Sequence, residues 1–107
     1  MTTLSVARDF SKYPGGRFIK ISENSGEEFR DRLLLPALTT NGRVEVELDG
    51  VVGYGSSFLE EVFGGIIRAM KWRTRTEFNQ HVAFTSERDS WVREVNQYID
   101  EELSRQV

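Results

Sequence analysis

The feature that most constrains the fold is a short alternating strand that leads through a glycine-containing turn into a long apolar helix. Val44, Val46 and Leu48 alternate with Glu45 and Glu47, and this alternation predicts a strand over residues 43–48 with one apolar and one polar face. A strand buried on both faces would be apolar throughout. The glutamates therefore predict that one sheet face meets water or a partner, and that helices cover mainly the other face.

The helix after the turn has a broad apolar face. Its apolar residues recur every three or four positions, which is typical of an amphipathic helix that packs against a sheet or another helix. They are Phe58, Leu59, Val62, Phe63, Ile66, Ile67 and Met70.

Two more amphipathic helices are predicted from their caps and spacing. The first begins at Ser25, which forms a capping box with Glu28, and ends at residues 40–42. Pro36 lies inside this helix and should bend or fray its last turn, because a proline ring clashes with the carbonyl four residues earlier. The second begins at the N-cap Ser86 and continues toward the C-terminus.

Three other segments are predicted strands, at residues 4–6, 17–21 and 81–85. The element order is then β-β-α-β-α-β-α, with a turn at residues 13–16 between the first two strands. Because strand–helix–strand units favour parallel crossovers, we expect an α/β fold with a small mixed four-stranded sheet and three helices mainly on one face. The length of 107 residues fits one domain over residues 1–107.

Composition excludes several functions. Fourteen Lys and Arg against 17 Asp and Glu give a net charge of −3, which argues against nucleic-acid or membrane binding by the domain as a whole. No Cys and one His, His81, exclude a disulfide and a Cys/His zinc site within one copy. Glu27/Glu28 and Glu60/Glu61 are not acid–base pairs, because helical neighbours point about 100° apart. We therefore expect no enzyme, metal or cofactor, and a cytoplasmic location without signal peptide or membrane span.

The turn of residues 53–57 has two interpretations. Ser57 and Glu60 match a capping box, which would give Ser57 a purely structural role. Alternatively, the unpaired N–H groups at this helix start favour an anion, although the Lys of a nucleotide-binding P-loop is missing. A sensor that binds a nucleotide or another anion at this helix N-terminus is therefore one candidate function.

The same segment resembles the STAS domain of sulphate transporters and anti-sigma-factor antagonists. That domain has an Asp-Ser-Ser-Gly-Leu-Gly turn between a strand and a helix, and Ser56, Ser57 and Leu59 match its serines and leucine. The whole chain is still more similar to the STAS-like family of unknown function, over roughly residues 8–85. The similar segments are Asp9-Phe10-Ser11, Pro14-Gly15-Gly16-Arg17, Ser25-Gly26-Glu27-Glu28-Phe29-Arg30 and the block from Gly53 to Glu61.

This resemblance implies a non-catalytic regulatory module that docks a protein partner, either a histidine-kinase-like ATPase or a serine kinase. In the antagonists the second serine is phosphorylated, which makes Ser57, and next Ser56, the implied phosphorylation sites. Gly55 replaces the motif Asp, and Glu60 and Glu61 should repel a phosphate on Ser57. The implied partner-binding residues are Gly53, Tyr54, Gly55, Ser56, Ser57, Phe58, Glu60, Glu61 and Gly64.

The remaining features each have a structural and a functional interpretation. The mid-helix pair Gly64-Gly65 costs about 1 kcal/mol per residue relative to alanine, which either close packing or a notch for a partner backbone would explain. The basic residues 68–75, with Trp72 among them, fit a solvated helix end, an acidic partner or nucleic acid. Arg17 is either a phosphate clamp or a surface arginine. The polar sheet face leaves a third candidate function, an assembly module.

Overall fold

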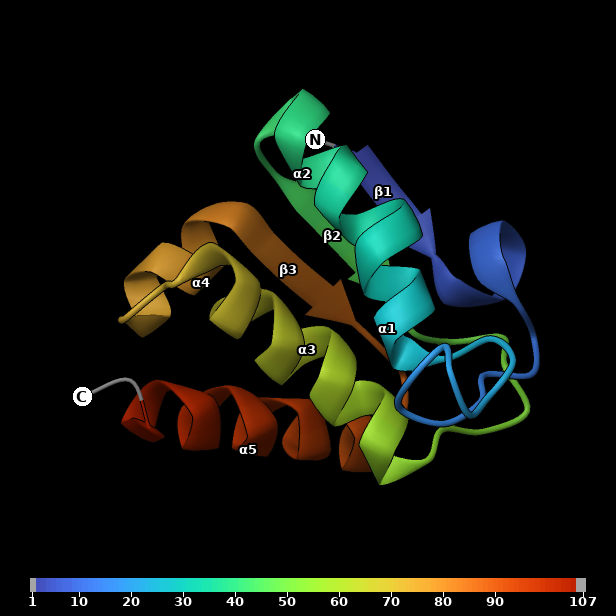
Figure 1. Ribbon diagram of the computed structural model, residues 1–107. Helices are drawn as coiled ribbons and strands as arrows, with labels where there is room; N and C mark the ends of the chain where they lie inside the picture. Colours follow the sequence, from blue (N-terminus) through green and yellow to red (C-terminus); the bar gives the residue numbers. More distant parts are fainter. Residues whose placement is uncertain (1, 106–107) are drawn as a thin grey trace.

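The sheet is purely parallel and small. The computed structural model describes residues 2–105, and within them three strands lie in the order β1 (Thr2–Ser5), β2 (Val44–Glu47) and β3 (Val82–Thr85) (Figure 1). Val46 lies in register with Leu4 on one side and with Phe84 on the other. Strands joined through helices run parallel, as the predicted crossovers required.

The two faces of the sheet differ as the alternation predicted. Val44 and Val46 of β2 are buried, whereas Glu45 and Glu47 are half-buried. The helices α1, α2 and α3 lie over one face of the sheet (Figure 1). A central strand with one apolar and one polar face is therefore confirmed.

The predicted strand at residues 17–21 is wrong, and with it the mixed four-stranded sheet. Within the described chain, residues 11–25 form turns and bends only. The backbone carbonyls of Gly16 and Arg17 accept hydrogen bonds from the N–H groups of Gly26 and Glu27, at 2.9 and 3.0 Å. Because these carbonyls satisfy the start of a helix, they are not available to a sheet. β1 ends instead in a π-helical turn, η1 (Val6–Phe10).

The first predicted helix is one continuous run with a wider turn inside it. Its parts are α1 (Gly26–Phe29), a π-helical turn η2 (Arg30–Leu34) and α2 (Leu35–Asn41). Ser25 caps the start as predicted, since its hydroxyl accepts from Glu28 N at 3.1 Å, whereas the Glu28 carboxylate binds Arg32 at 2.9 Å.

Pro36 was predicted to bend or fray the last turn of this helix, and this prediction is wrong. The helix widens in η2, immediately before Pro36, where a wider turn accommodates a ring that lacks an N–H. The last turn stays regular. It ends at Gly42, whose φ of 76° is the left-handed conformation that favours glycine.

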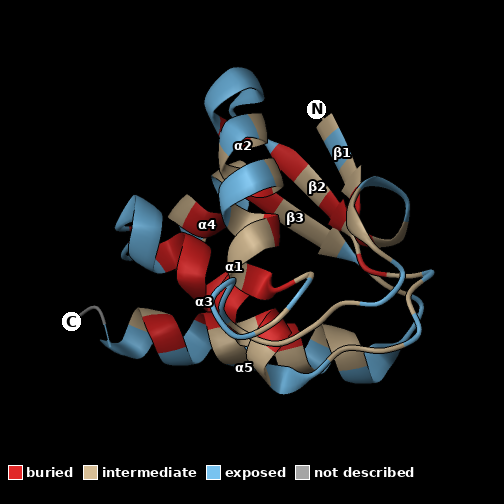
Figure 2. Cartoon of the chain, turned by 45° about the vertical axis from the view of Figure 1, so that its right-hand side comes forward, coloured by how far each residue is buried: buried red, intermediate tan, exposed pale blue. Residues whose placement is uncertain are grey.

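Three helices follow in the second half of the chain. They are α3 (Ser56–Met70), α4 (Arg75–His81) and α5 (Asp89–Arg105). α4 was not predicted, although Thr74 and Glu77 form a complete capping box at its start. α3 lies between α1 and α5 and supplies much of the buried core (Figures 1 and 2).

The mid-helix glycines of α3 make room for neighbouring side chains. A Cβ on Gly65 would collide with the Arg30 guanidinium, and one on Gly64 with the Glu60 carboxylate. A Cβ on Gly26 would lie 2.7 Å from the Phe58 carbonyl oxygen, so α1 and α3 approach closely. Close packing explains the glycine pair, because arginine and glutamate side chains fill the space that a partner backbone would need.

Candidate functional site

The N-cap of α3 lies two residues before the predicted N-cap, Ser57. Gly55 is the N-cap, and none of the described side chains caps this end. The capping box of Ser57 with Glu60 is therefore wrong. Ser57 is the second residue of the helix, and the Glu60 carboxylate binds Arg17 and Arg68 instead. Charge-assisted hydrogen bonds to two arginines are stronger than a bond to one backbone N–H.

The turn before α3 is an exposed rim of glycine and serine. Gly55 and Ser56 are exposed, and Gly53 and Ser57 are half-buried. A Cβ at Gly53 or Gly55 would meet no described atom within 4 Å. The backbone of this turn is therefore open to close approach by another molecule.

Tyr54 anchors the turn from below. Its hydroxyl donates to the Leu48 carbonyl at 2.6 Å, and its ring packs against Phe58 and Trp91, with centroids 5.4 and 4.8 Å away. Burial, and secondly the charge of Asp49, raise the pKa of Tyr54 well above its usual value. The hydroxyl therefore stays protonated and keeps the turn tied to the end of β2.

Three of the predicted partner-binding residues are buried. Phe58 is 1% exposed and Glu61 6%, and Gly64 is buried as well. Phe58 packs against Phe10 and Phe29, because its position faces the core side of α3. These residues support the exposed rim from inside the molecule and do not form part of the surface itself.

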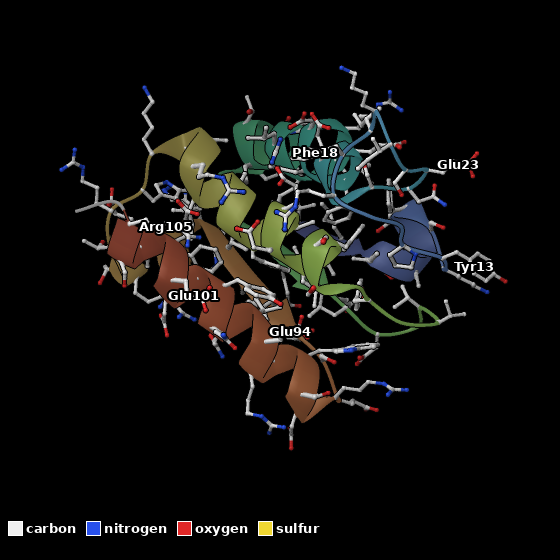
Figure 3. The ribbon with its side chains drawn as sticks, turned by 60° about the horizontal axis from the view of Figure 1, so that its bottom comes forward. Tyr13, Phe18, Glu23, Glu94, Glu101 and Arg105 are labelled. Atoms are coloured by element: carbon white, nitrogen blue, oxygen red, sulfur yellow. The ribbon has the colours of Figure 1, made fainter. Side chains whose placement is uncertain are left out.

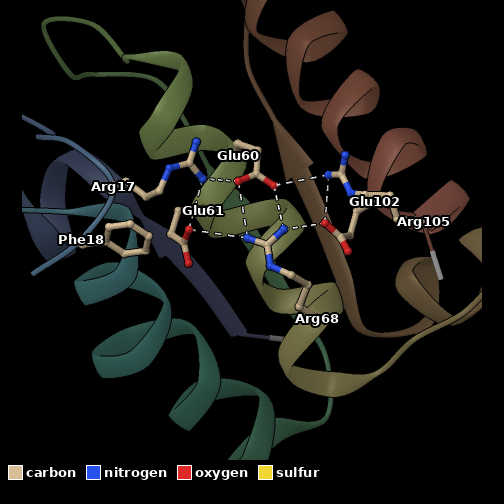
Figure 4. Close-up of a pocket in the computed structure, with 7 residues that line it drawn as sticks. All are labelled: Arg17, Phe18, Glu60, Glu61, Arg68, Glu102 and Arg105. Carbon is tan, nitrogen blue, oxygen red and sulfur yellow. Dashed lines mark hydrogen bonds and ion pairs between the residues drawn. The ribbon is translucent and has the colours of Figure 1, made fainter.

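An ionic network lies directly below the rim and joins four parts of the chain (Figure 4). Glu60 pairs with Arg17 of the loop and with Arg68, whose Nη1 lies 2.8 Å from Glu60 Oε2. Glu61 pairs with Arg30 of η2 and, at 3.2 Å, with Arg17. Local sequence patterns gave no signal for this network, since Arg17 and Glu60 are 43 positions apart.

The C-terminal helix completes the network. Glu102 of α5 is 2% exposed and pairs with Arg68 and, at 3.1 Å, with Arg105. Burial alone would raise the pKa of Glu60, but the hydrogen bonds from Arg68 and Arg17 outweigh it and hold that pKa below its usual value. The hydrogen bond with Glu60 raises the pKa of both Arg17 and Arg68. Glu60, Arg17 and Arg68 are therefore charged at neutral pH.

An open hollow lies over this network (Figure 4). Its lining consists of the paired side chains and one aromatic ring: Arg17, Phe18, Glu60, Glu61, Arg68, Glu102 and Arg105. The charged side chains that line the hollow form ion pairs with one another. A ligand in the hollow would therefore meet neighbouring positive and negative groups. In residues 2–105 no group of three or more His, Cys, Asp or Glu side chains is placed to hold a metal ion.

Two residues of the basic segment after α3, Trp72 and Arg75, are held by contacts within the domain. Trp72 is 5% exposed and stacks on His81, with ring centroids 5.1 Å apart. Arg75 binds the side chains of Asn96 and Asp100 at 2.6 and 3.3 Å. A buried tryptophan has no free face for base stacking, which favours the interpretation as a helix end.

These elements define a small α/β domain in which a parallel strand leads through an exposed Ser-Ser turn into a core helix. The chain belongs to the family described as a STAS-like domain of unknown function, whose family model matches residues 25–90, and the resemblance seen in the sequence is thereby confirmed. A search of the curated proteins and a search of the solved structures found no significant match. None of the helices in the described part of the chain is both long and apolar enough to cross a membrane.

Proposed function

We propose that this domain is a non-catalytic regulatory module that binds a protein partner through the turn of residues 53–57 and the first turn of α3. The partner proposed is a histidine-kinase-like ATPase or a serine kinase. The observation that carries the proposal is the rim formed by exposed Gly55 and Ser56 and half-buried Ser57, which lies within the matched segment of a STAS-like family. Its open backbone lets a partner approach closely.

Phosphorylation of Ser57, with Ser56 as the second site, is the proposed switch. A phosphate adds nearly two negative charges and three acceptor oxygens. The start of α3 favours such a group, because its N–H groups carry no side-chain cap. The repulsion expected from Glu60 and Glu61 is reduced, since Arg17, Arg30 and Arg68 pair with these two carboxylates. A phosphate here would add charge to the rim without unfolding the helix.

The experiment measures binding of this domain to each histidine-kinase-like ATPase and serine kinase encoded in the same genome, purified one at a time. We expect one of them to bind, and Ser57→Asp to weaken the complex by about tenfold, which is about 1.4 kcal/mol. Ser90→Asp is the matched control, because Ser90 is exposed and is also the second residue of its helix. Incubation with the partner and MgATP should add one phosphate to the mass of the wild-type domain, and none to Ser57→Ala.

Failure of every candidate to bind would contradict the proposal. Equal effects of Ser57→Asp and Ser90→Asp would contradict the role of the rim, since a general effect of added charge would then explain both.

A second candidate function, a nucleotide or anion sensor, is favoured by the same uncapped start of α3. A ligand at 100 times its dissociation constant adds about 2.7 kcal/mol to the free energy of unfolding. Thermal unfolding of the domain alone with ATP, ADP, GTP and phosphate separates the two candidates. We expect no shift, and a rise in the midpoint that Ser57→Asp abolishes would favour the sensor.

A further inference from the structure

Most of the large exposed apolar side chains lie on or beside one loop. Six are exposed among residues 2–105: Tyr13 (67%), Phe18 (44%), Ile19 (42%), Ile21 (75%), Val52 (73%) and Met70 (40%). The first five belong to the loop of residues 11–25 or lie beside it, because Val52 N donates to the Lys12 carbonyl at 2.9 Å. We call Tyr13, Phe18, Ile19, Ile21 and Val52 the apolar loop surface.

This loop has a defined conformation. Gly15 N donates to the Asn24 carbonyl at 2.8 Å, which closes the loop on itself, and a Cβ at Gly15 would collide with the Glu23 carbonyl. Ile19 N donates to the Glu27 carboxylate at 2.9 Å, and Arg17 binds Glu60. The loop therefore holds its apolar side chains outward in a fixed arrangement. Exposed apolar clusters of this kind mark interaction sites.

The apolar loop surface continues the rim at residues 53–57. The two loops lie side by side in Figures 1 and 2, and the Lys12–Val52 hydrogen bond joins them directly. In Figure 3 Tyr13 lies at the outer margin of the molecule and Phe18 lies beside the helices. A partner that covers the rim therefore also reaches the loop.

The rim alone lacks the groups that usually give affinity. Interfaces bury roughly 800 Å² per partner, and a few large aromatic or aliphatic residues carry most of the binding energy. Phe58 is buried, and the Tyr54 hydroxyl is engaged by Leu48. The exposed part of the turn offers glycine and serine only. The missing apolar anchors are the side chains of the neighbouring loop.

The charge of the loop indicates the chemistry of the partner surface that contacts it. Within residues 11–25, Arg17 is paired with Glu60 and Glu61. The remaining charged residues are two cations, Lys12 and Lys20, and one anion, Glu23, whereas the chain has a net charge of −3. Lys12 and Lys20 are exposed beside the apolar side chains. A partner surface with apolar residues and neighbouring carboxylates is complementary to this arrangement. An anionic bilayer is less suitable, because the rest of the domain is acidic and would be repelled.

We infer that the apolar loop surface supplies the main affinity for the protein partner, and that it takes an apolar, acid-flanked patch of that protein. The inference rests on the proposed function for the class of partner. It assigns separate roles to two adjoining surfaces, in which the loop provides affinity and the serine rim provides regulation.

The test compares matched variants against the ATPases and serine kinases named above. The double variant Tyr13→Ser/Ile21→Ser should weaken binding by at least about tenfold, as loss of central apolar anchors does. Met70→Ser is the control, since Met70 is as exposed as Ile19 but lies at the far end of α3, and it should leave binding unchanged. Lys20→Glu should weaken binding at low salt more than at high salt, and Arg93→Glu on α5 should not. Thermal unfolding midpoints should agree among all variants, since every changed side chain is exposed.

The outcomes separate this inference from the proposed function. Binding that Ser57→Asp weakens and the loop variants leave unchanged would overturn the inference alone. Binding that the loop variants weaken and Ser57→Asp leaves unchanged would support it and overturn the proposed role of the rim. No binding to any candidate would overturn both.

Two further measurements exclude other occupants. Cosedimentation with phosphatidylcholine vesicles that contain phosphatidylglycerol, if the loop variants abolish it, would assign the surface to a membrane and overturn the inference. Light scattering that shows a dimer of the wild-type domain and a monomer of the double variant would assign it to a second copy, with the same consequence.

Discussion

The start of α3 and the turn of helix after it differ sharply, although they are one helical turn apart. Gly55 and Ser56 are exposed and uncapped, whereas Glu60 and Glu61 lie among four arginines that reach them from the loop, η2, α3 and α5. The nine residues 53–61 therefore contain both an exposed surface and the charged side chains that hold this surface in place. Substitutions in the support should change stability, and substitutions in the rim should change binding.

The largest effect expected in the support is at Glu61. Glu61→Ala removes a carboxylate that Arg30 and Arg17 both bind, although Arg30 keeps its ion pair with Asp31. The loss should therefore lie at the low end of the about 3–5 kcal/mol that breaking a buried ion pair costs. Urea unfolding of the purified variant measures the change in the free energy of unfolding. Glu101→Ala on the exposed side of α5 is the control, and a loss as small as that of the control would show that the network does not support the rim.

The next largest expected effect is a loss of stability when a helix cap is removed, and it distinguishes the cap residue Thr74 from Ser57 of the rim. Thr74→Ala removes the capping box of α4 and should cost about 1 kcal/mol. Ser57→Ala should cost much less, because its hydroxyl caps no backbone N–H. Thermal unfolding of both variants tests this contrast. Equal losses would restore the interpretation of Ser57 as a structural cap.

The smallest expected effect is the contribution of Glu60 to the pH dependence of the free energy of unfolding. Its folded-state pKa lies below the ordinary value of 4.5, so its contribution to stability is complete above that value and is lost as the pH falls through the folded pKa. Glu60→Gln should therefore unfold with a weaker dependence on pH between neutral and acidic conditions. Urea unfolding midpoints across this range, with Glu101→Gln for comparison, measure the difference. A steeper dependence in Glu60→Gln would contradict the sign of the shift.

Local patterns predicted the parts of the fold whose stabilising contacts are local. Alternation gave β2 and the 3.6-residue period gave α3, because each pattern directly reflects which side faces the core. Residues 17–21 have strand-like composition, yet their carbonyls bind the start of α1, and composition does not record such a partner. α4 could have been found from the spacing of Thr74 and Glu77.

The residues predicted for the candidate site divide into exposed and buried ones, and the sequence did not predict this division. The family resemblance made Glu61 an expected partner-binding residue, whereas arginines distant in the sequence pair with it and it is buried. Phe58 was assigned to the surface through the motif, and its burial follows from its place on the apolar stripe of α3. The burial of Glu61 depends on long-range ion pairs, and the burial of Phe58 depends on which side of α3 it occupies.

The close approach of Arg30 to Gly65 also couples the residues that positions 30 and 65 can accept. The Arg30 guanidinium lies too close to the position of a Cβ at residue 65, so a methyl group there would shift this arginine and disturb its ion pair with Glu61. We therefore expect that relatives with alanine at position 65 have a shorter side chain at position 30, so that substitutions at the two positions are correlated.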